Sequence, residues 1–149
     1  MKKVIISVSN DLTTDQRVNK TCLALQKWGC EVLLVGCIRN EIIPIDRLFK
    51  THRFSPLFKH GPFFYAELNI RLFFFIILNK ADFVVSNDLD TLLANYLASR
   101  IKNIPIVYDS HELFTEVPEL ANRKFVKSIW NRIEKLIFPK LICNIMSLC

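Results

Sequence analysis

In Ile106-Val107-Tyr108-Asp109-Ser110-His111-Glu112-Leu113-Phe114, an apolar run stops at a polar cluster that holds one histidine and two carboxylates. The apolar residues from 104 to 107 predict a buried strand. In an open α/β sheet, ligands bind just outside the carboxyl ends of the strands. We therefore expect Asp109, Ser110, His111 and Glu112 to line a ligand site.

Two earlier strands are followed by the same kind of polar cluster. The apolar run Val4–Val8 precedes Asn10-Asp11, and the run Asp82–Val85 precedes Asn87-Asp88. Parallel strands bring their carboxyl ends to one edge of a sheet, so we expect all three clusters to lie together. Helix capping explains each Asn or Asp taken singly. The coincidence of three clusters at one edge favours a functional site.

The first strand belongs to a strand–helix–strand unit. Thr13 with Gln16 fits a capping box, which starts a helix after the strand. Gly29 is expected to end that helix, and residues 31–35 form the next strand. This spacing predicts parallel pairing through a right-handed crossover. The fold class is therefore α/β, a Rossmann-like, doubly wound and mainly parallel sheet in one domain over residues 1–149.

Several enzyme classes are disfavoured by missing motifs. The chain has three glycines, and none lies between the first strand and its helix. The GxGxxG fingerprint and the P-loop are therefore missing, which disfavours an NAD-type oxidoreductase or a P-loop enzyme. A GxSxG elbow is also missing, which disfavours acyl hydrolysis.

The middle of the chain is basic and then strongly apolar. Lys50–Phe54 predicts a short third strand, and the basic residues around it are expected to form an exposed face, with contact to lipid headgroups or a phosphorylated acceptor as the alternative. In Phe63–Leu78, the uninterrupted apolar run is much shorter than the roughly 20 residues of a bilayer span. We therefore expect a helix that is mostly buried against the sheet. The alternative is that some of its phenylalanines enter a membrane interface.

Two more helices are predicted downstream. Asn87 or Asp88 can cap the first, and the second runs from about Phe125 to Phe138 and ends at Pro139. The buried stripe of the first is expected to consist of Leu89, Leu92, Leu93, Tyr96 and Leu97.

Composition restricts the partners and the compartment. The formal net charge of +6, from 20 Lys and Arg against 14 Asp and Glu, favours anionic partners such as phosphates or acidic lipid. No long basic run predicts a nucleic-acid tail. The five cysteines have no metal-ligand spacing, so they are expected to act as small buried hydrophobes in a reducing cytoplasm. Polar residues interrupt the first apolar run too early for a signal peptide.

The motifs also occur in a recognisable order. Ser9-Asn10-Asp11 and Asp15-Gln16-Arg17-Val18 come first, Asn87-Asp88-Leu89-Asp90 follows, and Tyr108–Leu113 precedes Glu116-Val117-Pro118-Glu119. This succession resembles the N-terminal half of a GT-B glycosyltransferase of the retaining group 1, or family 4. The resemblance covers the chain from Lys3 to about Lys140.

The resemblance implies an enzyme with two Rossmann-like domains facing a cleft. The N-terminal domain binds the acceptor, and the C-terminal domain binds a nucleotide-sugar, which is a co-substrate rather than a cofactor. It implies that His111 is catalytic and lies near the transferred sugar, and no metal is expected. The residues expected to contact the acceptor or the donor sugar are Asn10, Asp11, Asp15, Arg17, Asn87, Asp88, Asp109 and Glu112.

The chain departs from that family in three ways. The loop after the first strand lacks glycines, residues 143–149 lack the usual strand and serine, and the nucleotide-sugar domain is absent. We therefore expect a truncated gene product or half of a split enzyme, inactive alone. The expected partners are a glycan or lipid-linked acceptor, a membrane surface and a separate donor domain, but no nucleic acid. The expected location is the cytoplasm, including the inner face of the membrane.

Two alternatives remain at this point. The chain could be a non-catalytic module of a split enzyme that binds an acceptor or a membrane. It could also be half of a nucleotide-sugar epimerase-like enzyme.

Overall fold

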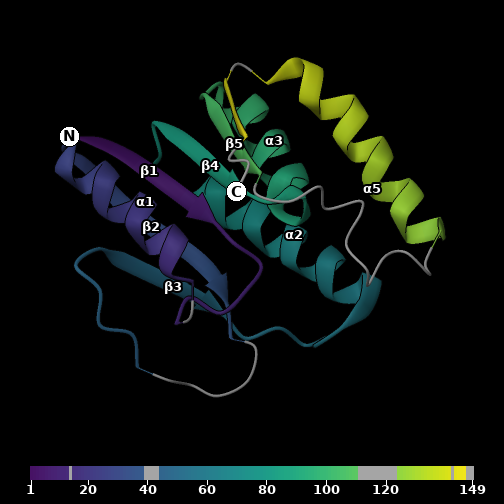
Figure 1. The fold of residues 1–149 in the computed structure, drawn as a ribbon, viewed down its shortest axis with the longest axis horizontal. Helices are drawn as coiled ribbons and strands as arrows, with labels where there is room; N and C mark the ends of the chain where they lie inside the picture. The colour runs from purple at the N-terminus through teal and green to yellow at the C-terminus, as the bar shows by residue number, and fades with distance from the viewer. Residues whose placement is uncertain (14, 39–43, 111–123, 142, 147–149) are drawn as a thin grey trace.

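The computed structural model describes residues 1–13, 15–38, 44–110, 124–141 and 143–146. Within them, the strands are β1 (Lys2–Ser7), β2 (Cys30–Cys37), β3 (Lys50–Phe54), β4 (Phe83–Asn87), β5 (Ile106–Ser110) and β6 (Cys143–Met146). They form one six-stranded sheet in the order β3-β2-β1-β4-β5-β6 (Figure 1). Every pairing is parallel. The predicted Rossmann-like α/β fold is confirmed.

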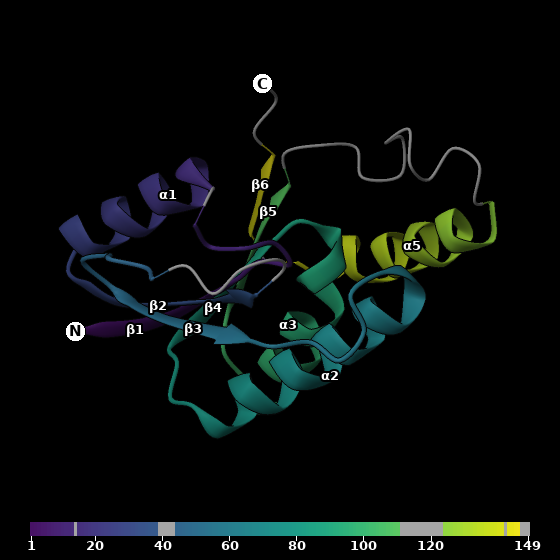
Figure 2. The same cartoon turned by 90° about the horizontal axis from the view of Figure 1, so that it is seen from below.

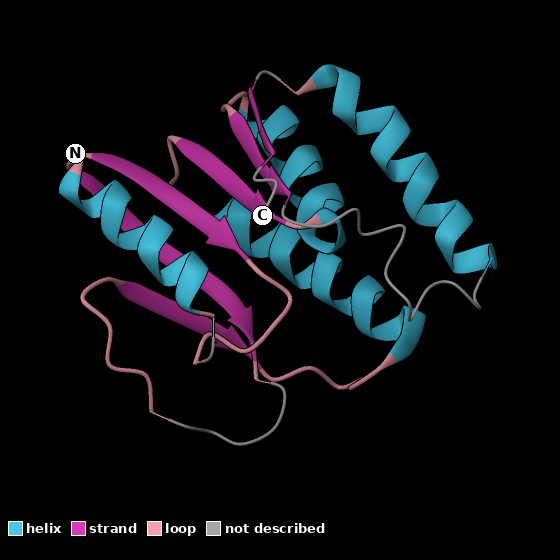
Figure 3. Ribbon diagram, viewed as in Figure 1, coloured by secondary structure: helices cyan, strands magenta, loops and turns pink. Residues whose placement is uncertain are grey.

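Helices lie on both faces of the sheet (Figures 2 and 3). One face carries α1 (Gln16–Lys27), and the other carries α2 (Gly61–Leu78) and α3 (Leu89–Lys102). The helix α5 (Lys124–Ile137) packs beside α3 and leads into the short 3-10 helix η2 (Phe138–Lys140). The strand β6 then pairs with β5, which corrects the expectation that residues 143–149 contain no strand.

The first strand–helix–strand unit forms as predicted, but with a different cap. Asp15, not Thr13, is the N-cap of α1, and its Oδ1 accepts a hydrogen bond from the backbone N–H of Val18 at 3.0 Å. A carboxylate suits this position because it also faces the positive end of the helix dipole. Gly29 has a φ of +81°, the left-handed conformation that turns the chain from α1 into β2.

The core has two halves because alternate residues of a strand face opposite sides of the sheet. Val4 and Ile6 of β1 belong to the cluster that packs under α1, where Cys22 is buried. Ile5 belongs to the cluster on the other face, where Phe64 and Leu68 of α2 are buried. The strand β1 is therefore covered on both faces, as in doubly wound sheets.

The helix α2 is less buried than predicted. Its buried residues are one stripe of four: Phe64, Leu68, Leu72 and Ile76. A helix on the outside of a sheet buries one side only, so a helix that is apolar all round leaves its other side in solvent. By length and composition α2 would suffice to cross a membrane, a property that the core helix of a soluble protein can share.

The buried face of α3 also differs from the predicted stripe. Leu89 and Leu92 are buried, but Leu97 is 45% exposed. Thr91 and Asn95 are fully buried instead, because this helix face meets the sheet at the carboxyl ends of β1 and β4. Polar side chains fit there because they bond to the hydroxyl of Ser7 and to the backbone oxygens of Ser7 and Asn87.

Candidate functional site at the carboxyl edge of the sheet

The strand order reverses between β1 and β4, which are neighbours in the sheet although β2 and β3 lie between them in sequence. Ligands of open α/β sheets bind outside the carboxyl ends of the strands at such a reversal. Asn10-Asp11 follows β1, and Asn87-Asp88 stands at the end of β4, so the two clusters flank it. Asp109 of β5 is the register partner of Asn87. The structure thus brings these predicted residues to one edge.

The loop after β1 is held together by its own polar side chains. Asn10 Nδ2 donates to Asp15 Oδ2 at 3.0 Å, and the backbone N–H of Thr13 donates to Asp11 Oδ1 at 3.2 Å. Asp11 Oδ1 also lies 3.8 Å from Nη1 of Arg53 at the end of β3, and each of these two side chains is 15% exposed. Asp11 and Asp15 therefore have clear structural roles in ordering this loop.

Gly36 of β2 allows that loop to lie close to the sheet. A Cβ at this position would stand 2.5 Å from Leu12 Cδ2 and 3.0 Å from the backbone oxygen of Asn10. The backbone N–H of Cys37 donates to the same oxygen at 3.3 Å. The loop itself has no glycine, and the glycine that allows the close approach lies in the neighbouring strand.

Arg17 and Asp88 connect the two sides of the reversal. Arg17 Nη2 at the start of α1 lies 4.0 Å from Asp88 Oδ2, and both side chains are partly exposed. The backbone of Asp88 has a φ of +65° and a ψ of 166°, a conformation that residues other than glycine rarely adopt. The N–H of Asp88 donates to the oxygen of Asp109 at 3.0 Å, which helps to hold this conformation.

Asn87 is the most unusual residue at this edge. Its side chain is 1% exposed, and neither its amide nitrogen nor its amide oxygen has a hydrogen-bond partner among the described residues. A buried polar group without a partner costs about 1–3 kcal/mol. A bound ligand that hydrogen-bonds to the amide is one way to recover this free energy.

A buried polar network under the reversal was not predicted. Ser7 Oγ of β1 donates to Asn95 Oδ1 of α3 at 3.3 Å, and Asn95 Nδ2 donates to the oxygen of Thr91 at 2.8 Å. The hydroxyls of Thr91 and Ser86 are 2.8 Å apart. The signal for this network was present in the sequence, since Thr91 and Asn95 stand four residues apart on either side of the apolar residues 92–94.

Three other sequence predictions have different outcomes. His111 and Glu112 lie outside the described residues, so their predicted catalytic and binding roles stay predictions. Arg53, which was expected on an exposed basic face, instead reaches Asp11 at the sheet edge. Cys22 and Cys37 are buried as expected, whereas Cys30 is only half-buried. Burial raises the pKa of the Cys22 thiol to about 12.

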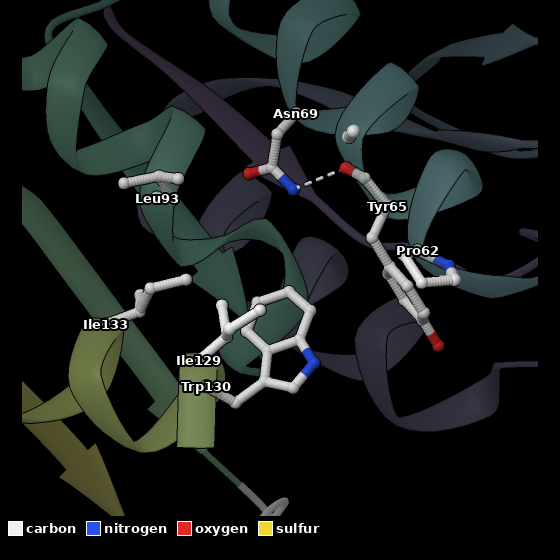
Figure 4. A pocket seen from close by; sticks show the side chains of 8 residues that line it. Pro62, Tyr65, Asn69, Leu93, Ile129, Trp130 and Ile133 are labelled. Carbon is white, nitrogen blue, oxygen red and sulfur yellow. Dashed lines mark hydrogen bonds between the residues drawn. The ribbon is translucent and has the colours of Figure 1, made fainter. Parts of the chain in front are cut away.

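Within the described part of the chain, no group of three or more His, Cys, Asp and Glu side chains could hold a metal ion. One cavity of about 250 Å³ lies away from the sheet edge, between α2, α3 and α5 (Figure 4). Its wall is almost entirely carbon, with Tyr65, Leu93 and Trp130 among the lining side chains.

Comparison with known proteins identifies relatives of the fold only. No known family's sequence profile and no curated protein sequence matches the chain significantly. Among solved structures, sucrose-phosphate synthase from Thermosynechococcus elongatus superimposes with a TM-score of 0.67 at 11% identity, over 100% of this chain and 48% of that protein. A putative UDP-N-acetylglucosamine 2-epimerase from Listeria monocytogenes gives 0.64 at 14% identity, over 97% and 39%.

A third similar structure contains a nucleotide. The Streptomyces sp. SF2575 glycosyltransferase SsfS6, complexed with thymidine diphosphate, gives a TM-score of 0.59 at 12% identity, over 99% of this chain and 49% of that one. The chain therefore spans half or less of each of these three proteins. Together these likenesses show that the chain has the Rossmann-like α/β fold of a GT-B domain.

Proposed function

We propose that this chain is the N-terminal, acceptor-side domain of a retaining GT-B glycosyltransferase of group 1, or family 4. The complete enzyme would transfer a sugar from a nucleotide-sugar to a glycan or lipid-linked acceptor. Two findings support the proposal: the GT-B fold, and the gathering of polar side chains where the strand order reverses. His111, as the residue that follows β5, is proposed to lie near the transferred sugar.

The buried amide of Asn87 carries the proposal. A primary amide offers both a donor and an acceptor, which match the hydroxyl groups of a sugar. Hydrogen bonds to a ligand would contribute binding free energy here, because the amide is buried and no described side chain bonds to it in the free protein. Arg17 and Asp88 form a partly exposed ion pair beside Asn87. The charged groups of this pair can hydrogen-bond to hydroxyl groups of the acceptor.

The chemistry of transfer explains why this chain alone is proposed to be inactive. Negative charge grows on the leaving diphosphate in the transition state, and stabilising it is usually a large contribution to catalysis. In GT-B enzymes that task belongs to the second domain. We therefore expect negligible transfer by the 149-residue chain, and measurable turnover of a nucleotide-sugar by the purified chain would contradict this.

Nuclear magnetic resonance titration of the whole chain tests the acceptor site. The probes are a panel of mono- and oligosaccharides, with uridine and thymidine diphosphates as competitors. At least one sugar should shift the side-chain amide resonances of Asn87, and the same sugar should bind at least about tenfold more weakly to Asn87→Ala. If only the nucleoside diphosphates shift these resonances, or if no sugar does, the acceptor assignment is wrong.

The likeness to the Listeria epimerase supports a second candidate, half of a nucleotide-sugar epimerase-like enzyme. The two candidates differ in what binds at the reversal between β1 and β4. An epimerase half would respond to a nucleotide-sugar and ignore free acceptor sugars. The same titration therefore separates them, with UDP-N-acetylglucosamine as the additional probe.

A further inference from the structure

The side of α2 that faces away from the sheet is apolar and exposed. Phe63 and Phe74 are 70% and 57% exposed, and Ile70 stands on the same side of the helix between them. The helices packed beside it also expose apolar side chains, Leu97 and Ile101 of α3 and Ile129 and Leu136 of α5. Single apolar side chains are normal on a protein surface, but seven large ones on three helices that pack side by side favour an interaction site.

The same three helices account for most of the net charge of the chain. Seven of their residues are Lys or Arg and three are Asp or Glu, which accounts for +4 of the formal +6. Two of the three acids are already engaged or buried: Glu67 binds Arg71 at 2.8 Å, and Asp90 is 4% exposed. Glu67 in turn neutralises Arg71, and Lys102 donates to the backbone oxygen of Ile76 at the end of α2. The exposed cations among the described side chains of these helices are Arg100, Arg132 and Lys135.

The cavity between the helices opens on this surface. Pro62, Ala66 and Ile129 at its rim are exposed, and Trp130 lies inside it (Figure 4). An apolar cavity without polar partners does not hold ordered water. The surface is therefore basic, and this cavity, called the slot below, gives it an apolar opening that can accommodate a hydrocarbon chain.

We propose that this face, formed by α2, α3 and α5, docks the protein on an anionic lipid bilayer. Aromatic side chains insert at the level of the headgroups while Lys and Arg side chains contact lipid phosphates. The helix α2 lies on the membrane and does not cross it, because its stripe of Phe64, Leu68, Leu72 and Ile76 is part of the core. The inference does not depend on the proposed glycosyl transfer.

Vesicle sedimentation of the full chain tests the docking. Wild type should bind vesicles of phosphatidylglycerol and phosphatidylcholine, bind pure phosphatidylcholine more weakly, and lose affinity as salt is raised. The Phe63→Ser/Phe74→Ser variant should bind at least about tenfold more weakly. Its matched control is Trp28→Ser/Leu48→Ser, which removes two even more exposed apolar side chains elsewhere, and this control should change binding by less than about threefold.

The contribution of charge has its own variant. Arg132→Gln/Lys135→Gln should weaken binding to anionic vesicles by about fivefold per charge and leave binding to neutral vesicles unchanged. If wild type binds neither kind of vesicle, or if the matched control loses as much as the phenylalanine variant, the proposal is wrong. It is also wrong if the phenylalanine variant only converts a dimer into a monomer, because the face then covers a second copy.

Tryptophan fluorescence tests the orientation, with one tryptophan replaced by phenylalanine at a time. The chain has two tryptophans, Trp28 and Trp130. In Trp28→Phe, brominated lipid in the anionic vesicles should quench Trp130, which lies in the slot. In Trp130→Phe, the exposed Trp28 should stay unquenched, because α1 lies on the opposite face of the sheet. The reverse pattern would place the membrane on the α1 side and overturn the assignment.

Discussion

Replacing Gly36 with alanine should push the loop after β1 away from the sheet. The new Cβ would meet Leu12 Cδ2 at 2.5 Å and both the oxygen of Asn10 and Cγ2 of Val8 at 3.0 Å. Leu12 is 2% exposed, so its side chain has no free space to move into. Overpacking of this kind costs about 1–3 kcal/mol, and each kcal/mol lowers the melting temperature of a chain of this size by about 2–4 °C.

A double-mutant cycle with Leu12→Ala tests the stated cause. Urea unfolding gives the free energy of unfolding of the four proteins. Because Leu12→Ala removes the closest contact, Gly36→Ala should cost at least about 1 kcal/mol less in that background than in wild type. Gly29→Ala is the control: its cost comes from a φ of +81° and not from a steric contact, so it should not depend on Leu12. If the Gly36 and Leu12 changes add within about 0.5 kcal/mol, the packing argument is refuted.

Three further predictions concern single side chains. Burial raises the pKa of Cys22 from 9.0 to about 12, so the stability that its protonated thiol provides should be intact below pH 9 and be lost as the pH rises to 12. Between these two pH values, the free energy of unfolding should fall by up to about 4 kcal/mol more in wild type than in Cys22→Ala. Asn87→Ala should leave the melting temperature unchanged or higher, whereas Asn95→Ala, which breaks the buried network, should cost about 1–3 kcal/mol by urea unfolding. Asp15→Ala should cost about 0.5–2 kcal/mol in the same assay, and an unchanged value would exclude Asp15 as the cap of α1.

The strands were predictable because their signal is local. The β-branched runs around Val4 and Val84, ended by polar residues, needed only a short window of sequence. The extent to which α2 is buried was not predictable in this way. A helix that is apolar on all sides carries no periodic signal for the side that meets the sheet, so only the packing in three dimensions selects Phe64 and Leu68.

The candidate site was predictable only where a strand end defines it. Asn87 and Asp109 were located by the rule that parallel strands end at one edge, and the structure places them in register. Arg53 and Gly36 were missed because their roles arise from contacts with a loop that is distant in sequence. Long-range contacts of this kind leave no trace in a sequence window.

The unequal cover of the two faces of the sheet has a consequence for local opening. Of the described helices, α1 alone lies on its face, whereas α2 and α3 support each other on the opposite face. Detaching α1 exposes one half of the core and leaves the other intact. Amide hydrogens of α1 should therefore exchange with deuterated solvent through a partial opening, while those of β1 should exchange only through global unfolding.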